Sequence, residues 1–162
     1  RLAALSKGLT QFTIIPEPFL TQAEKLGLRN FYNISDLKIP FWWNGILTRE
    51  SIIKSRRPLM LKLARAVVEA IHIIKTDKEY AKALFSKHLG VTDPEGLERA
   101  YKDYSNVFPE VPYPNPDGVK TMLDDLAPKN PKAAAADPKT FVDLSLIREL
   151  DSSGFIKQLY RR

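Results

Sequence analysis

The spacing of apolar residues predicts helices in the second half of the chain. Between 59 and 74 they recur at i, i+4, i+5, i+8, i+9, i+12 and i+15, which places them along one helix face of about four turns. Pro58 suits the first position of this helix, since no hydrogen-bonded N–H is needed there. A second helix is expected over 79–89 behind the N-cap residue Asp77, and a third over 94–107 behind the N-cap residue Asp93.

Proline and alanine interrupt the helical pattern further along. The segment 108–116 (FPEVPYPNP) contains four prolines and is expected to be an extended connector. Helical spacing returns over 119–126 and again over 142–150, followed by a last short helix at 155–160. The stretch 129–137 (KNPKAAAAD) has low complexity and favours a mobile link.

The first 50 residues have a different pattern. Residues 1–8 resemble the end of a helix, and the branched, apolar run 12–15 predicts a buried strand that stops at Pro16. A helix is expected over 19–26. The aromatic, branched segment 39–48 reads as an extended edge strand or bulge, because proline and glycine interrupt it.

Together these elements predict an α/β, helix-rich protein: a partial lobe with few strands, followed by a C-terminal helical region. We expect residues 1–50 to form the α/β part and 51–127 to form helices that pack on it. Residues 128–138 would be a flexible linker, and 139–162 the closing helices.

Composition excludes several classes of chemistry. The 162 residues are 44% hydrophobic and 27% charged, which is typical of a globular protein. There is no cysteine, and His72 and His88 are the only histidines. No apolar run approaches the roughly 18 residues of a membrane span, and no familiar nucleotide, hydrolase or metalloprotease motif occurs. We therefore expect no catalytic residues, no metal and no cofactor.

The net charge of +6 is unevenly distributed. Residues 1–75 carry 12 Lys and Arg against 5 Asp and Glu, whereas residues 76–162 carry 13 against 14. The excess centres on 49–65. Such a patch is often a solvated face, but it also suits an acidic ligand, an acidic protein surface or nucleic acid.

Two short segments carry the candidate binding residues. Trp42 and Trp43 are adjacent, and neighbours in an extended segment point to opposite faces. One indole can therefore pack inside while the other, beside Asn44, lines a ligand cleft; alternatively both anchor a sheet edge. Glu17 and Pro18 lie where the predicted strand turns into a helix, so Glu17 is expected either to cap that helix or to bind a cationic group of a ligand.

The order of the segments resembles the C-terminal half of ABC-transporter solute-binding proteins, in the branch for nitrate, sulfonates, taurine and thiamine-precursor pyrimidines. The matching stretches are FTIIPEPFLTQAEKLG, IPFWWNGILTRESI, RPLMLKLARAVVEAI, DKEYAKALFSKHLG, FPEVPYPNPDGVKTMLDDLA and FVDLSLIRELDSSGFIKQLY. The last stretch and the helix after Arg57-Pro58 weigh most.

This resemblance implies a two-lobed, non-catalytic receptor of the type II periplasmic-binding-protein fold, which passes a small solute to a membrane permease. It implies an extracytoplasmic location and a monomer when full length, with this chain a fragment. The positions that match cleft-facing segments are Glu17, Pro18, Phe19, Trp42, Trp43 and Asn44. No nucleic-acid partner is expected.

Two other functions stay open. The same fold includes enzymes of thiamine-precursor pyrimidine synthesis, although no cysteine or histidine cluster is visible here. A helical interaction module is the other alternative. It would use the basic face near Arg56 to bind an acidic partner or nucleic acid, and its binding would fall steeply with salt.

Overall fold

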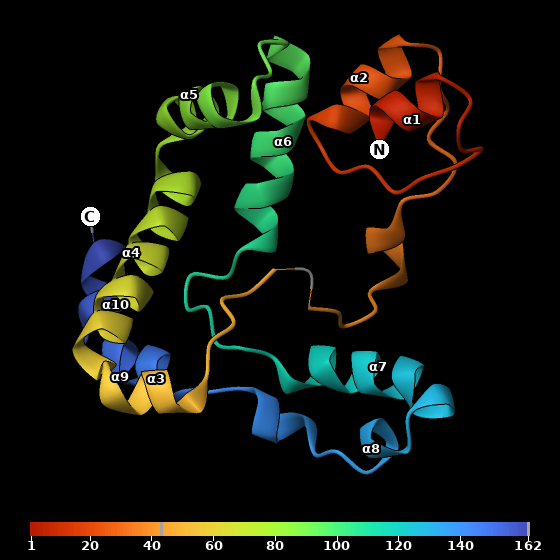
Figure 1. The fold of residues 1–162 in the computed structure, drawn as a ribbon. Helices are drawn as coiled ribbons and strands as arrows, with labels where there is room; N and C mark the ends of the chain where they lie inside the picture. The colour runs from red at the N-terminus through yellow and green to blue at the C-terminus, as the bar shows by residue number, and fades with distance from the viewer. Residues whose placement is uncertain (43, 162) are drawn as a thin grey trace. The chain divides into compact units, whose positions relative to one another are not determined.

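The regular structure of the chain is helical. The computed structural model describes residues 1–42 and 44–161, and within these ranges it contains helices but no strands (Figure 1). The predicted helix-rich character is confirmed. The predicted α/β lobe is wrong, because neither 12–15 nor the described part of 39–48 forms a strand.

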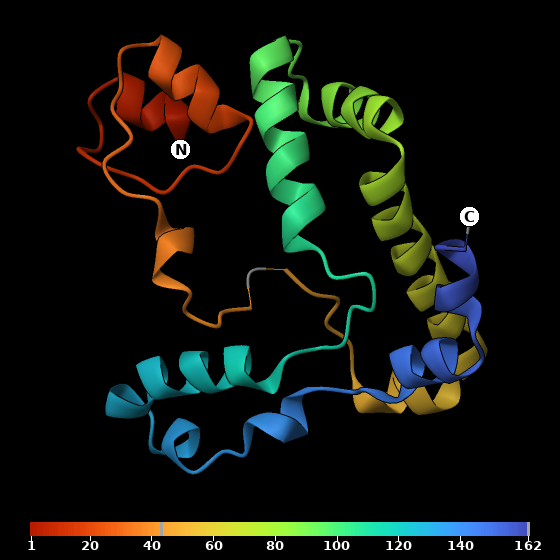
Figure 2. The same cartoon turned by 180° about the vertical axis from the view of Figure 1, so that it is seen from behind.

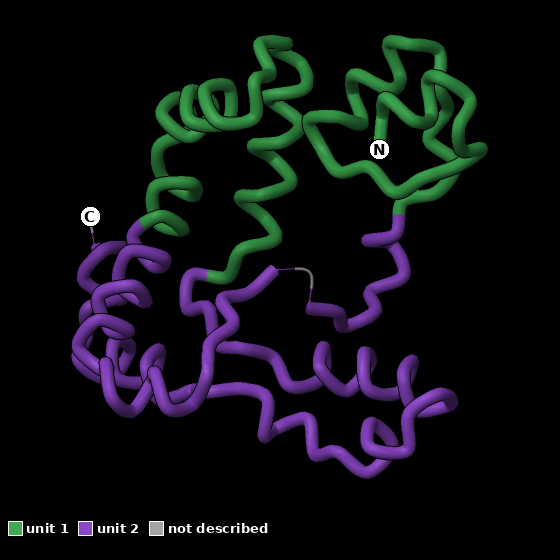
Figure 3. The backbone as a smooth tube through the Cα atoms, viewed as in Figure 1, with its two compact units in different colours: residues 1–33, 70–109 green, residues 34–69, 110–162 purple. Residues whose placement is uncertain are grey.

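The chain folds into two compact units (Figure 3). Unit 1 combines Arg1–Asn33 with Ala70–Pro109, and unit 2 combines Ile34–Glu69 with Glu110–Arg162. The long helix α4 (Arg57–Thr76) belongs mostly to unit 2 and ends in unit 1.

Unit 1 is built from short helices whose ends carry the predicted signals. The Asp77 carboxylate accepts a hydrogen bond from the Tyr80 N–H at 3.0 Å, and Asp93 accepts one from the Gly96 N–H at 2.9 Å. Both are N-caps, as their sequence positions predicted. The helices are α1 (Leu2–Ser6), α2 (Phe19–Lys25), α5 (Lys78–Leu89) and α6 (Pro94–Val107).

Helix α6 is the centre of unit 1 and packs on both α2 and α5. The ring of Tyr104 lies 5.5 Å from the ring of Phe85 and 6.2 Å from that of Phe108, centroid to centroid. The Lys75 ammonium donates hydrogen bonds to the Ser105 and Phe108 carbonyls at 2.8 and 2.9 Å. A cation at the C-terminal end of α6 satisfies carbonyls that lack helical partners.

Unit 2 contains most of the remaining elements. Asn130 caps α8 by accepting the Lys132 N–H at 3.1 Å, so the stretch predicted as a linker holds a short helix. Besides most of α4, the helices of unit 2 are the following, with η marking a 3-10 helix: η1 (Ile34–Leu37), α3 (Glu50–Ser55), α7 (Pro116–Leu126), η2 (Ala127–Lys129), α8 (Pro131–Ala134), η3 (Pro138–Phe141), α9 (Ser145–Ser152) and α10 (Phe155–Leu159).

The core of unit 2 forms where α9 and α10 cover one face of α4, as both views show (Figures 1 and 2). An ion pair of 2.6 Å between Arg57 and Glu149 lies at the start of α4, and the Arg65 guanidinium lies 4.3 Å from the Phe155 ring centroid. The buried members of this core are Ala64, Val68, Ile147, Leu150 and Ile156.

The strand predictions failed for a physical reason. Phe12 and Ile14 are 85% and 51% exposed, and Ile39 and Ile46 are 54% and 57% exposed. A branched, apolar run forms a strand only where another strand satisfies its N–H and C=O groups. Within the described residues these two segments have no neighbouring strand, so local propensity alone did not produce a sheet.

Candidate functional site

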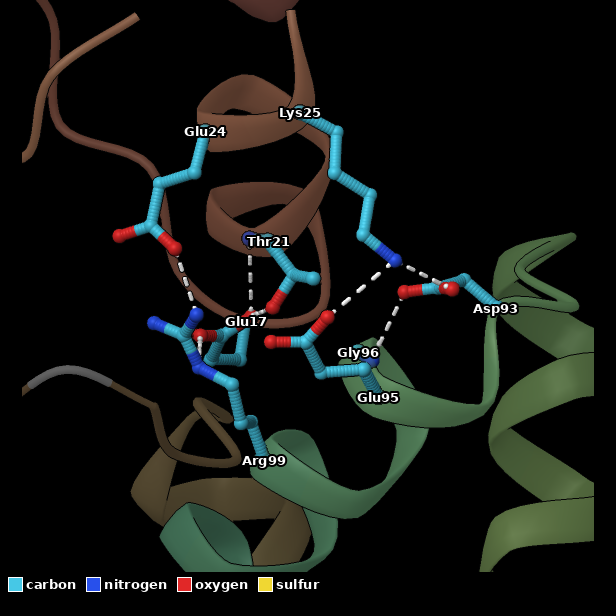
Figure 4. Close-up of polar contacts among 8 residues, drawn as sticks. All are labelled: Glu17, Thr21, Glu24, Lys25, Asp93, Glu95, Gly96 and Arg99. Atoms are coloured by element: carbon cyan, nitrogen blue, oxygen red, sulfur yellow. Dashed lines mark hydrogen bonds and ion pairs between the residues drawn. The ribbon is translucent and has the colours of Figure 1, made fainter. Parts of the chain in front are cut away.

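The most buried charge of unit 1 is the carboxylate of Glu17, whose residue is 5% exposed (Figure 4). It accepts hydrogen bonds from the Thr21 N–H at 3.2 Å and the Thr21 hydroxyl at 2.9 Å. Its other oxygen lies 2.7 Å from Nε of Arg99. Glu17 thus holds the first turn of α2 and at the same time pairs with a cation from α6.

One guanidinium serves two carboxylates. Nη1 of Arg99 donates to Glu24 at 2.5 Å, while its Nε faces Glu17. The hydrogen bond to Glu24, followed by the charges of Glu17 and Glu24, raises the pKa of Arg99 above its ordinary value, although burial opposes this. The side chain is 35% exposed, so its outer part remains in contact with water. Arg99 of α6 therefore contacts both Glu17, which precedes α2, and Glu24, which lies near the end of α2.

A second, more exposed group of charges continues the same helix contact (Figure 4). The Lys25 ammonium lies 2.6 Å from the Asp93 carboxylate and 3.3 Å from that of Glu95. The hydrogen bond from Lys25, and next the one from the Gly96 N–H, lowers the pKa of Asp93. Asp93 therefore joins two roles, since it caps α6 and pairs with α2.

The start of α2 also lies close to the first turn of α6. A Cβ atom placed on Gly96 would lie 3.4 Å from both the Pro18 carbonyl oxygen and the Thr21 Cβ, which is van der Waals contact. Pro18 is buried, and Phe19 begins α2 half-buried. Glu17 was considered as a partner for a cationic ligand group, and in this structure it pairs with the chain's own Arg99.

The aromatic segment belongs to unit 2. Trp42 is half-buried, and a Cβ on Gly118 of α7 would lie 3.1 Å from its backbone N and 3.2 Å from its indole Cδ1. Because Gly118 has no side chain, the backbone and the indole of Trp42 can lie directly against α7. Phe41 and Asn44 on either side are exposed. Trp43, the other indole of the prediction, lies outside the described residues.

The structure distributes the predicted site residues over both units. Glu17, Pro18 and Phe19 lie in unit 1, and Trp42 and Asn44 lie in unit 2. Within 1–42 and 44–161, no three His, Asp or Glu side chains gather as metal ligands would. No helix in these ranges combines the length and apolarity that a membrane crossing requires.

Sequence reasoning missed Arg99 and Gly118. A signal for Arg99 existed: it lies beside Ala100 and three residues after Gly96, both of which the structure buries. A charged residue on that face calls for a counter-charge on the neighbouring element. Gly118 gave no such signal, because a glycine in the first turn of a helix does not reveal what approaches it.

No family model matches the chain, and neither a search of curated proteins nor a search of solved structures returned a match. The resemblance to solute-binding proteins therefore depends on the order and composition of the sequence segments. Among the residues that carry this resemblance, Trp42 makes a defined packing contact with Gly118 of α7.

Proposed function

We propose that this chain is part of a non-catalytic solute-binding component of an ABC importer, in which segment 39–48 forms an aromatic wall for a small organic solute. The observation that carries the proposal is the seating of Trp42 on Gly118. It fixes an aromatic side chain that remains partly accessible, with the exposed amide of Asn44 two residues on. A fixed aromatic surface with a few polar groups suits small organic ligands.

The chemistry of the segment favours one class of solute. Between Lys38 and Arg49 the chain has no charged residue, so this wall supplies apolar contact and hydrogen bonds but no cation. A bare inorganic anion such as nitrate gains little from such a surface. A sulfonate with an organic part, or a pyrimidine that stacks on an indole, gains much more.

The exposed apolar residues of the segment support a role inside a larger receptor. Phe41, Ile46 and Leu47 are 54%, 57% and 83% exposed. Extended, branched and aromatic residues in water are stabilised when a neighbouring strand or lobe covers them. We propose that a further lobe does so, and that the assembled protein works outside the cytoplasm with a membrane permease.

Tryptophan fluorescence tests the proposal, because Trp42 and Trp43 are the only tryptophans. The protein is produced from its entire reading frame and titrated with taurine, an alkanesulfonate, a thiamine-precursor pyrimidine and nitrate. We expect one organic solute to change the emission with saturation. Calorimetry then compares the affinity of Trp42→Ala and Trp43→Ala with that of the parent.

A matched control separates the wall from general damage. Phe141→Ala removes another exposed aromatic side chain of unit 2 and is expected to leave affinity unchanged. At least one tryptophan variant is expected to weaken binding about tenfold or more, since a stacked aromatic contact contributes on the order of 1–3 kcal/mol including its buried area. If no solute binds, or if both tryptophan variants bind like the parent, the proposal is wrong.

A further inference from the structure

Helix α4 has a second apolar face that the core of unit 2 does not use. One face buries Ala64 and Val68 against α9 and α10. On the opposite side Leu59 and Leu63 are 51% and 39% exposed, and Ala66 is exposed as well. Residues four apart are neighbours on a helix surface, so the two leucines form one contiguous apolar ridge.

Two basic side chains flank this ridge. Arg56, just before α4, and Lys62 lie three residues before and three residues after Leu59, and both are exposed. Among the described residues neither of these two cations has an ion pair. Their neighbours differ: Arg57 pairs with Glu149, Lys54 pairs with Glu50, and Arg65 lies over the ring of Phe155.

Arg56 and Lys62 are therefore positive charges of the basic segment that remain accessible to a partner after folding. Segment 49–69 contains six Lys and Arg residues against two Glu residues. We propose that the exposed surface of α4, defined by Arg56, Leu59, Lys62 and Leu63, docks an acidic amphipathic helix of a partner protein. Its leucines would receive the apolar stripe of that helix, and the cations its flanking carboxylates. The proposal stands independently of solute binding.

The same observations disfavour a membrane or nucleic acid as the occupant. An interfacial helix needs a long apolar face, whereas the exposed leucines here cover little more than one turn. The surface also lacks an aromatic side chain on which a base can stack.

Fluorescence anisotropy with designed probes tests the proposal. The first probe is a labelled 18-residue helix with leucines on one face and glutamates beside them. A second probe carries lysine in place of each glutamate, and vesicles of phosphatidylcholine with phosphatidylserine represent lipid. The full chain is compared with R56E/K62E, with L59A/L63A, and with K129E/K132E. The last pair matches the charge change at exposed lysines elsewhere in unit 2.

We expect the glutamate probe to bind the parent, with affinity that falls as salt rises from about 50 to 500 mM. R56E/K62E is expected to reduce affinity about tenfold or more and L59A/L63A severalfold, while K129E/K132E changes it less than about twofold. Circular dichroism verifies that each variant keeps its helix content. The proposal is overturned if the glutamate probe does not bind, if both probes bind equally, or if R56E/K62E binds like the parent. Binding to the vesicles in place of the glutamate probe overturns it in favour of lipid.

Discussion

The ion pair between Glu17 and Arg99 predicts that Glu17→Gln changes the free energy of unfolding in opposite directions when Arg99 is present and when it is absent. Glu17→Gln keeps the size of the side chain and removes its charge, so Arg99 loses one of its two carboxylates. Breaking a fully buried ion pair by removing one partner costs about 3–5 kcal/mol. Here Arg99 is 35% exposed and keeps Glu24, so we expect a smaller loss of about 1–3 kcal/mol in the free energy of unfolding.

The opposite change leaves a buried charge behind. Arg99→Met removes the cation while the Glu17 side chain stays 4% exposed, with Thr21 as its remaining donor. In that background the carboxylate is an uncompensated buried charge. Glu17→Gln is then expected to be neutral or stabilising, because a neutral amide is cheaper to bury. The double-mutant cycle isolates this coupling.

Urea denaturation at pH 7, followed by circular dichroism at 222 nm, measures the four free energies of the cycle. Glu24→Gln is the control, since Glu24 and Arg99 are both 35% exposed and such pairs contribute less than about 1 kcal/mol. Equal costs of Glu17→Gln with and without Arg99 would refute the reasoning. That result would mean that the ion pair does not stabilise the contact between α2 and α6.

Three further predictions follow from other contacts. Gly118→Ala places a Cβ 3.1 Å from the backbone of the tryptophan segment, so it is expected to lower stability by about 1–2 kcal/mol and shift the tryptophan emission. Gly45→Ala, which meets open space, is expected to do neither, and a silent Gly118→Ala would contradict the seating of Trp42. The pKa of Asp93 is lowered by its lysine partner, so that pairing stabilises the fold above the ordinary value of 3.8 and is lost as pH falls through the lower folded value. Asp93→Asn, which keeps an N-cap residue, should therefore show a shallower loss of stability below about pH 4 in acid unfolding. Val68→Ala, at a fully buried position, is expected to cost about 1–3 kcal/mol, against less than about 0.5 kcal/mol for Val107→Ala at 70% exposure, as measured by urea denaturation.

The helices that sequence reasoning located best are those with strong local signals. Pro58, Asp77 and Asp93 predicted the starts of α4, α5 and α6, and the structure confirms them to within about one residue. Caps, prolines and a regular apolar stripe act within one or two turns of the backbone. A sequence displays such short-range causes directly, so these elements needed no knowledge of the fold.

The candidate site shows the opposite case. Glu17 was expected either to cap a helix or to bind a cationic group of a ligand. In the structure it accepts hydrogen bonds from Thr21 in α2 and pairs with a cation of the chain itself, an arginine 82 positions later. The tandem tryptophans were expected to place one indole inside without indicating which one, and the contact of Trp42 with Gly118 depends on a helix far along the chain. Which residue meets which, over such separations, follows from packing and has no local signature.

The sequence by itself determined the longer helices, the Asp77 and Asp93 caps and the excess of positive charge, since each depends on residues close together in the chain. Only the tertiary structure decided that 12–15 and the described part of 39–48 form no strand, because a strand needs a partner to satisfy its backbone. The tertiary structure also decided which cations form ion pairs. Arg57 and Arg99 pair with carboxylates from other parts of the chain, whereas Arg56 and Lys62 are exposed and have no ion pair among the described residues.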